Sequence, residues 1–219
     1  MSVIIGLTGQ SGAGKSTVCE AFESEGFAVI DCDSVARYVT RPGSECNREL
    51  AGVFPGCFDE SFTLDRAKMA SIVFADSEKL RLLENIEYRY ITEEIDEQIG
   101  KLSQKSDYIV LDAPTLFEAG VDKLCACTLA VVSCEQLRLE RIIRRDGISE
   151  EQAKKRFGSQ RTEQFFKEKC GFLIENNGDA SAAKEQAREI AKKIRKINDA
   201  TGQHKTDGQE TGSETPRGS

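Results

Sequence analysis

A glycine-rich segment near the start of the chain constrains the fold more than any other feature. Residues 9–16 match the phosphate-binding pattern G-x-x-x-x-G-K-[S/T] at every fixed position and read Gly9-Gln10-Ser11-Gly12-Ala13-Gly14-Lys15-Ser16. Glycines let backbone N–H groups curl around phosphate oxygens without Cβ clashes, and the N-terminus of the helix that follows adds positive potential. The segment therefore predicts a strand–loop–helix unit that binds a nucleoside triphosphate, rather than an ordinary glycine-rich turn.

Side chains in and beyond this loop are candidates for holding the triphosphate and its metal ion. We expect Lys15 to bridge the terminal phosphates and the Ser16 hydroxyl to ligate Mg²⁺. Asp112 ends the apolar run Ile109-Val110-Leu111, the shape of a Walker B strand, and is the second candidate magnesium residue unless it orients the acceptor or only ends the strand. The predicted nucleotide-binding residues of the loop are Gly9, Gly12, Ala13, Gly14, Lys15, Ser16 and Thr17.

Strand-like and helix-like segments alternate along the chain. Short β-branched, apolar runs predict five strands, at residues 3–7, 27–32, 108–111, 124–132 and 172–174. Amphipathic spacing predicts helices at residues 15–25, 34–39, 64–74, 78–99, 135–145 and 183–197, and a capping box at residues 149–152 predicts one more. This alternation predicts an α/β fold, a doubly wound, mostly parallel five-stranded sheet of the P-loop NTPase type.

The length of 219 residues accommodates one such domain with elaborations, which we assign to residues 1–198. The helical segment at about residues 44–102 is an insertion between the second and third strands, and the polar excursion at about residues 144–162 predicts a lid. Residues 199–219 lack hydrophobic periodicity, which predicts a disordered polar tail.

The charge balance argues against a general nucleic-acid binder. The chain carries 30 Lys+Arg against 37 Asp+Glu, a net charge of −7, whereas such binders need a cationic face. No apolar run approaches the roughly 20 residues that cross a membrane, and the N-terminus lacks the features of a signal peptide. We expect a cytoplasmic protein that binds neither nucleic acid nor membrane, and we expect a monomer.

The scarcity of histidine narrows the possible chemistry. The only histidine, His204, lies in the predicted tail, so a histidine general base and a Ser-His-Asp triad are excluded. The eight cysteines are scattered, and without a secretion signal this pattern favours reduced, structural thiols over disulfides or a zinc site. Catalysis must therefore use carboxylates, lysine, arginine or a metal ion that arrives with the ligand.

Two carboxylates follow the second predicted strand, at the edge where open α/β sheets bind ligands. Asp31 and Asp33 are two residues apart, a spacing that points both side chains to one face of a strand. An acceptor hydroxyl at this edge needs a carboxylate to take its proton as the γ-phosphoryl group arrives. We expect Asp33 to be that carboxylate, with Arg37 nearby if a helix begins at Ser34; the alternative role for Asp33 is a helix cap.

Arg138, Arg141 and Arg145 recur at spacings of three and four and share one helical stripe. We interpret Arg138 as a solvated side chain paired with Glu135 and Glu140. Arg141 and Arg145 lead into the predicted lid, where small P-loop kinases carry arginines that neutralise the transferring phosphoryl group. We therefore assign catalytic roles to Arg141 and Arg145.

The guanine-reading pattern Asn-Lys-x-Asp of GTPases has no good match. The nearest string begins with His204 and lies in the predicted tail. The chain is also short for a large ATPase machine, so a small-molecule kinase remains.

Several segments together resemble the dephospho-CoA kinase family, in order from about residue 3 to residue 197. They are Gly6-Leu7-Thr8-Gly9, Val29-Ile30-Asp31-Cys32-Asp33-Ser34-Val35-Ala36-Arg37, Leu111-Asp112-Ala113-Pro114-Thr115-Leu116-Phe117-Glu118, Arg141-x-x-x-Arg145-Asp146, Gln160 and Ile174-Glu175-Asn176-Asn177-Gly178. The D-x-D with x-A-R and the P-x-L-F-E segments are more specific than the phosphate loop. The resemblance implies phosphorylation of the ribose 3′-hydroxyl of dephospho-CoA by ATP, the last step to coenzyme A.

The resemblance also implies a role for individual residues. Asp33 would be the catalytic base, and the insertion at residues 44–102 would be the helical subdomain on the CoA side. Asn176 and Gly178 would lie near the adenine of ATP. The residues implied to line the acceptor pocket are Arg37, Pro114, Leu116, Phe117 and Glu118.

Two other functions stay open at this point. One is a related P-loop kinase that acts on a nucleoside monophosphate or a shikimate-like acceptor, and the other is a nucleotide-binding switch without catalysis. The chain departs from the family pattern on the acceptor side, at Tyr88-Arg89, where His-Pro is usual, and at Thr115, where Leu is usual. It also has Cys170-Gly171 where Ala-Asp is usual.

Overall fold

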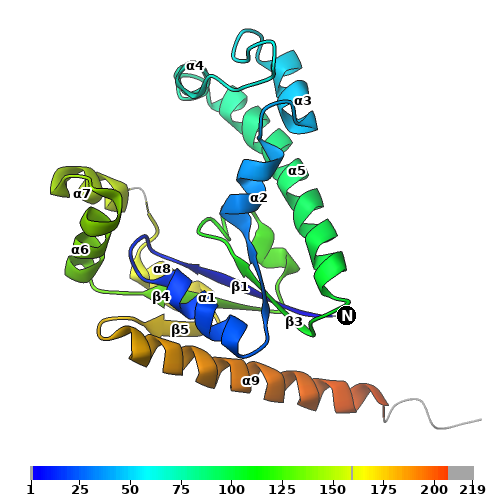
Figure 1. Cartoon of the computed structure of the whole chain (residues 1–219), viewed down its shortest axis with the longest axis vertical. Coiled ribbons are helices and arrows are strands. Elements are labelled where there is room, and N and C mark those ends of the chain that lie inside the picture. Colours follow the sequence, from blue (N-terminus) through cyan, green and yellow to red (C-terminus); the bar gives the residue numbers. More distant parts are fainter. Residues whose placement is uncertain (1, 159, 207–219) are drawn as a thin grey trace, which may run out of the picture.

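Five parallel strands form one sheet in the computed structural model, which describes residues 2–158 and 160–206, with side chains described as far as residue 200 (Figure 1). The sheet has the order β2-β3-β1-β4-β5, and every neighbouring pair is parallel. The predicted doubly wound α/β fold is confirmed. The strands are β1 (Val3–Gly9), β2 (Ala28–Asp31), β3 (Tyr108–Asp112), β4 (Cys127–Val132) and β5 (Phe172–Glu175).

Helices connect the strands and cover both faces of the sheet (Figure 1). They are α1 (Lys15–Ser24), α2 (Cys32–Val39), α3 (Glu45–Val53), α4 (Arg66–Val73), α5 (Ser77–Leu102), α6 (Glu135–Asp146), α7 (Glu150–Gly158), α8 (Glu163–Lys169) and α9 (Ala180–Thr206), with a 3₁₀ turn, η1 (Val121–Leu124). The capping box predicted at the start of α7 forms as two reciprocal hydrogen bonds between Ser149 and Gln152, of 3.0 and 3.2 Å.

The sequence prediction missed three elements and misplaced several boundaries, among them the starts of α2 and β4 and the end of α9. α3 and α8 are short helices, and η1 ends at residue 124, where the fourth strand was predicted to begin, whereas β4 begins at residue 127. α9 continues through residues 199–206, so the predicted tail boundary at residue 199 is wrong. The rest of that predicted tail, residues 207–219, lies outside the described residues.

Alternation along the strands divides the core between the two faces of the sheet. Ile5 and Leu7 of β1 are fully buried in a cluster with residues of α1 and α9. Ile4 points to the opposite face, against a cluster that includes Val35 of α2 and Ile95 of α5. The sheet is therefore covered on both sides, as a parallel sheet requires.

The predicted insertion is built around α5, which runs from the sheet to the far end of the molecule, where α3 and α4 lie (Figure 1). Ile95, in the second half of α5, packs into the core beside the sheet. Ile86, in the first half, joins a separate small core with Leu50 of α3 and Met69 of α4. The insertion thus has apolar packing of its own. None of the described helices combines the length and apolarity needed to cross a bilayer.

The register of the sheet gathers three loops at one edge. Asp112, the last residue of β3, lies opposite both Leu7 of β1 and Asp31 of β2. The loop after β1, the start of α2 and the loop after β3 therefore begin side by side. This edge is the place where parallel α/β sheets bind ligands.

We predict opposite effects for two glycine-to-alanine substitutions. Gly9 ends β1 with φ of +142°, and a Cβ there would collide with the carbonyl oxygen of Val131, so Gly9→Ala should lower the free energy of unfolding by at least about 2 kcal/mol. Gly100 lies in α5 with open space around it, so Gly100→Ala should raise it by about 0.5–1 kcal/mol. Urea unfolding midpoints of the two variants measure both effects; equal midpoints would contradict this description of the sheet edge.

Candidate active site

A cavity of about 580 Å³ opens at the gathered edge of the sheet. The phosphate loop and α1 contribute Gln10, Gly12, Gly14, Lys15, Ser16 and Thr17 to its lining. The last residues of β2 and β3 contribute Asp31 and Asp112, the first turn of α2 contributes Asp33, and the loop after β3 contributes Pro114. Arg141, Arg144 and Arg145 come from α6, and Asn176 and Ala180 from the segment after β5. The cavity is thus lined both by cations and by carboxylates, and these side chains come from segments that are far apart in the sequence.

The phosphate loop is held in shape by its neighbours. Gly14 has φ of +98° and passes so close to Asn176 that a Cβ would collide with the side-chain amide. That amide donates a 2.8 Å hydrogen bond to the carbonyl oxygen of Ala13. Lys15 bends back, with Nζ at 3.5 Å from the carbonyl oxygen of Gly9. Asn176 thus contacts the phosphate loop, while Gly178, the other residue predicted near the adenine, does not line the cavity.

Arg138 clamps the phosphate loop, and its predicted role as a solvated side chain is wrong. Only 5% of the residue is exposed. Its Nε donates to the carbonyl oxygen of Ser11 at 3.0 Å, its Nη2 donates to Oε1 of Gln160 at 2.8 Å, and its guanidinium lies over the ring of Phe157. One backbone carbonyl and one side-chain amide oxygen, rather than the glutamates of its own helix, therefore accept hydrogen bonds from this cation.

Arg141 also contacts the phosphate loop, but its side chain reaches the cavity. Its Nη1 donates to the carbonyl oxygen of Gly12 at 3.2 Å, and its Nη2 donates to that of Asn176 at 3.1 Å. These bonds fix a positive charge where the loop would bind phosphates. Arg138 and Arg141 of this helical stripe thus have different positions. Both bond to the phosphate loop, but only Arg141 lines the cavity.

Arg145 is paired with a carboxylate at the end of α6. Its Nε donates to Asp146 at 2.6 Å, and Arg156 of α7 contacts the same carboxylate. Hydrogen bonds from Arg145 and Arg156 lower the pKa of Asp146 to about 2, so the pair persists at neutral pH. Asp146 therefore joins α7, within the predicted lid, to an arginine of the cavity.

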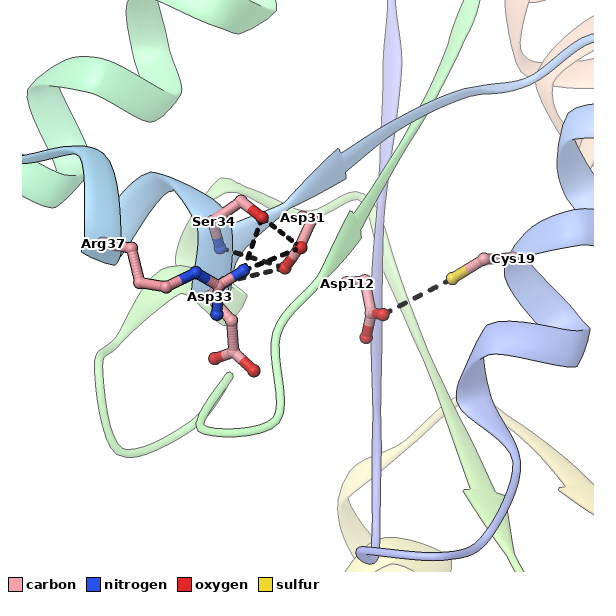
Figure 2. Close-up of polar contacts among 6 residues, drawn as sticks. All are labelled: Cys19, Asp31, Asp33, Ser34, Arg37 and Asp112. Atoms are coloured by element: carbon pink, nitrogen blue, oxygen red, sulfur yellow. Dashed lines mark hydrogen bonds and ion pairs between the residues drawn. The ribbon is translucent and has the colours of Figure 1, made fainter. Parts of the chain in front are cut away.

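Figure 2 shows that Asp31 and Asp33 point in different directions. Asp31 is the N-cap of α2 and accepts hydrogen bonds from the backbone N–H groups of Asp33 and Ser34, at 3.0 and 3.1 Å. Ser34 also donates its hydroxyl to Asp31, and Arg37 contacts both. Although burial opposes ionisation, these hydrogen bonds and Arg37 hold the pKa of Asp31 below its usual value.

The prediction that a strand points both carboxylates to one face is wrong, because β2 ends at Asp31 and α2 begins at Cys32. In the first helical turn the carboxylate of Asp33 points away from the carboxylate of Asp31 and the hydroxyl of Ser34 (Figure 2). Its carboxylate has no hydrogen bond or ion pair among the described residues and lines the cavity. The helix cap is therefore Asp31, and Asp33 is the carboxylate left free for a ligand.

Asp112 is a buried carboxylate that is only half satisfied. Its Oδ2 accepts a 3.5 Å hydrogen bond from the thiol of Cys19 (Figure 2), while Oδ1 is buried without a partner among the described residues. Burial raises the pKa of Asp112, against the attraction of Lys15. Asp112 and Ser16, whose hydroxyl belongs to the phosphate loop, line the same cavity. A carboxylate and a hydroxyl are a donor set that suits Mg²⁺, which binds through few protein oxygens plus phosphates and water.

A second cavity of about 470 Å³ adjoins the first and shares Gln10, Lys15, Asp33, Pro114 and Arg145 with it. Its remaining lining includes Glu118, which was predicted on the acceptor side, and Gln160 and Arg161, which precede α8. Lys15 and Asp33 therefore lie at the boundary between the two cavities.

Three residues predicted for the acceptor pocket lie elsewhere. Leu116 is fully buried in the core between the sheet and α2. Phe117 packs against Phe165 with ring centroids 5.4 Å apart and lines neither cavity. Arg37 is bound to Ser34 and Asp31 and lines neither cavity in this arrangement.

Sequence reasoning missed Arg144 and Arg161 as cavity residues. Gln160 was noticed only as part of a family resemblance, yet its Oε1 accepts from both Arg138 and the N–H of Ser11. The available signal was the polar run from Arg144 to Arg161, between the helix at residues 135–145 and the last strand. It predicted a lid without indicating which side chains face inward.

Comparisons with known proteins agree with this geometry. A model of the family described as dephospho-CoA kinase matches residues 3–182. A dephospho-CoA kinase from Oryza sativa subsp. japonica is 34% identical over 87% of this chain and 84% of its own length. The crystal structure of a Thermus thermophilus protein superposes with a TM-score of 0.76 at 30% identity, over 87% of this chain and 96% of that chain. Dephospho-CoA kinase from Campylobacter jejuni gives a TM-score of 0.64 at 26% identity, over 90% and 100%.

We predict that Asp112→Asn stabilises the ligand-free protein and impairs the enzyme. A carboxyl whose pKa is raised by folding weakens the folded state once it ionises, so an uncharged amide removes that penalty, while its oxygen still accepts from Cys19. The Tm at pH 7 should rise and the Tm increase on adding ATP and Mg²⁺ should shrink.

The gain should fade as the pH falls below the usual carboxyl range, about pH 4, because the wild-type group is then neutral in both states. Asp96→Asn, on the exposed surface of α5, is the matched control and should change neither quantity. A lower Tm for Asp112→Asn at pH 7 would contradict this description of the buried carboxylate.

Proposed function

The chain belongs to the dephospho-CoA kinase family, and on that premise we propose that it transfers the γ-phosphoryl group of ATP to the ribose 3′-hydroxyl of dephospho-CoA. The observation that carries this proposal is the position of Asp33, a free carboxylate at the junction of the two cavities, beside Lys15. One cavity suits the nucleotide on the phosphate loop, and the other suits an acceptor that brings its hydroxyl to Asp33.

ATP is proposed to bind with its phosphates on residues 9–17. Backbone N–H groups of the loop and Nζ of Lys15 would contact the β- and γ-phosphates. Ser16 and Asp112 would hold Mg²⁺, which when bound withdraws charge from the phosphate oxygens. Asn176, which already orients the loop through Ala13, stands on the nucleotide side of the cavity.

Asp33 is proposed to take the proton of the 3′-hydroxyl. As it does so, the hydroxyl oxygen forms a bond to the γ-phosphorus, and the bond from that phosphorus to the bridging oxygen of ADP breaks. A carboxylate with no hydrogen bond or ion pair among the described residues is suited to this task, because its oxygens are free to accept the proton. Asp31 is proposed to position α2 rather than to act on the hydroxyl.

Arginines of α6 are proposed to neutralise the charge that moves to ADP. Arg141 is held at the opening of the loop by backbone carbonyls, so its orientation is set before the nucleotide arrives. Arg145 lines both cavities while paired with Asp146, and Arg144 lines the nucleotide cavity. We further propose that residues 144–162 are a lid and residues 44–102 the CoA-side subdomain. The cytoplasmic location and the monomeric state stay predictions.

The direct test of the function is a comparison of acceptors. Purified protein is incubated with ATP and Mg²⁺ and, separately, with dephospho-CoA, AMP or shikimate, and phosphorylated products are measured. We expect product from dephospho-CoA at the highest kcat/KM. Turnover of AMP or shikimate without turnover of dephospho-CoA would favour the related kinase, and nucleotide binding without any product would favour the switch; the family match supports neither.

We predict that Asp33→Asn lowers kcat by at least about a hundredfold, because a positioned proton acceptor contributes on that scale. The Kd for ATP should stay within about twofold, since Asp33 faces the acceptor. Asp76→Asn is the matched control: Asp76 caps α5 in the insertion, and asparagine caps equally well. Wild-type kcat in Asp33→Asn would remove Asp33 from the mechanism.

A further inference from the structure

One cation of the second cavity has no role in the mechanism above. Three basic side chains line that cavity: Lys15, Arg145 and Arg161. Lys15 and Arg145 also line the nucleotide cavity, whereas Arg161 does not. Arg161 is therefore the positive charge that belongs to the acceptor side alone.

Arg161 is held in place by contacts from three other parts of the chain. Its Nε donates to Oε1 of Glu118, in the loop after β3, at 2.7 Å. Its guanidinium lies over the ring of Phe165 in α8, 4.8 Å from the centroid. Its carbonyl oxygen accepts a 3.3 Å hydrogen bond from the side-chain amide of Gln10 in the phosphate loop. These contacts fix both the backbone and the side chain of Arg161 before any ligand binds.

The same contacts leave the outer edge of the guanidinium available. Only Nε takes part in the pair with Glu118, and the two terminal nitrogens have no hydrogen-bond partner among the described residues. The side chain is 53% exposed, so a ligand in the cavity can reach it. A planar guanidinium with two free N–H-bearing nitrogens matches the paired oxygens of a phosphate.

The chemistry of the acceptor supplies such a group. In dephospho-CoA the diphosphate is attached to the 5′-carbon of the ribose whose 3′-hydroxyl is phosphorylated. When that hydroxyl faces Asp33, the diphosphate lies one sugar ring away, and ATP already occupies the first cavity. The second cavity, which Asp33 and Arg161 both line, is then the space open to it.

We propose that Arg161 binds the diphosphate of dephospho-CoA, with Glu118 and Phe165 orienting its guanidinium; this inference rests on the proposed function. Arg161 is thus a specificity-determining residue, which favours an acceptor that carries a diphosphate over a bare nucleoside. Lysine is a poor substitute, because its ammonium group is a point charge, whereas the planar guanidinium of arginine can donate two parallel hydrogen bonds to one phosphate.

The test compares Arg161→Ala and Arg161→Lys with the wild type, using dephospho-CoA and adenosine as acceptors. Adenosine keeps the ribose 3′-hydroxyl and lacks the diphosphate. For Arg161→Ala we expect kcat/KM for dephospho-CoA to fall at least about tenfold, mainly through KM, as for loss of hydrogen bonds to a charged group. The KM for ATP and the kcat/KM for adenosine should change less than about twofold, and Arg161→Lys should lie between.

Arg188→Ala is the matched control, since it removes a half-exposed, ion-paired arginine of α9 that lines neither cavity. It should leave all these constants unchanged, and thermal melting checks that each variant is folded. A surface ion pair that only supports the fold accounts for less than about a fivefold effect. An equal loss for adenosine and dephospho-CoA, or no loss for dephospho-CoA, would overturn the proposal.

Calorimetric titration of dephospho-CoA into protein loaded with a non-hydrolysable ATP analogue separates the two proposals. Binding that Arg161→Ala weakens, without turnover in the wild type, would contradict the proposed function and support the site. Turnover that the substitution leaves unchanged would support the function and contradict the site. No binding of dephospho-CoA to the wild type would contradict both.

Discussion

The capping of α2 by Asp31 is the interaction on which the site depends. By binding the first N–H groups of the helix, Asp31 ends β2 at the sheet edge and turns the chain within one residue. That turn carries Asp33 out of the strand and into the cavity, without a partner (Figure 2). The two aspartates are close in sequence but have different roles, because Asp31 accepts hydrogen bonds from backbone N–H groups whereas Asp33 lines the cavity without a partner among the described residues.

The conformation of the phosphate loop depends in turn on hydrogen bonds from residues of other elements. Arg138 and Arg141 of α6, Gln160 before α8 and Asn176 after β5 all bond to carbonyl or N–H groups of this loop. The nucleotide loop is therefore in contact with the elements that flank the predicted lid. Glu118 and Arg161 extend the same connection to the loop after β3. The nucleotide side and the acceptor side consequently share one continuous polar network.

The sequence predicts the sheet, most helices and the phosphate loop, because hydrophobic period and glycine pattern are local properties. Prediction from the sequence fails where the burial and contacts of a side chain depend on residues far away in the chain. The sequence predicts a solvated Arg138 paired with Glu135 and Glu140, yet the residue is buried and its Nε donates to the carbonyl oxygen of Ser11 in the phosphate loop. Leu116 belongs to the P-x-L-F-E segment and was predicted to line the acceptor pocket, but its apolar side chain packs in the core. The end of β2, shifted by one residue, reverses the expected relation of Asp31 and Asp33.

The account stands on Asp33 meeting the acceptor hydroxyl in front of the γ-phosphate. A crystal structure with dephospho-CoA and a non-hydrolysable ATP analogue measures this most directly. We expect one carboxylate oxygen of Asp33 to lie about 2.6–3.2 Å from the 3′-oxygen, a hydrogen-bond distance. A closed complex in which another side chain contacts the 3′-hydroxyl and Asp33 stays out of reach would contradict the account.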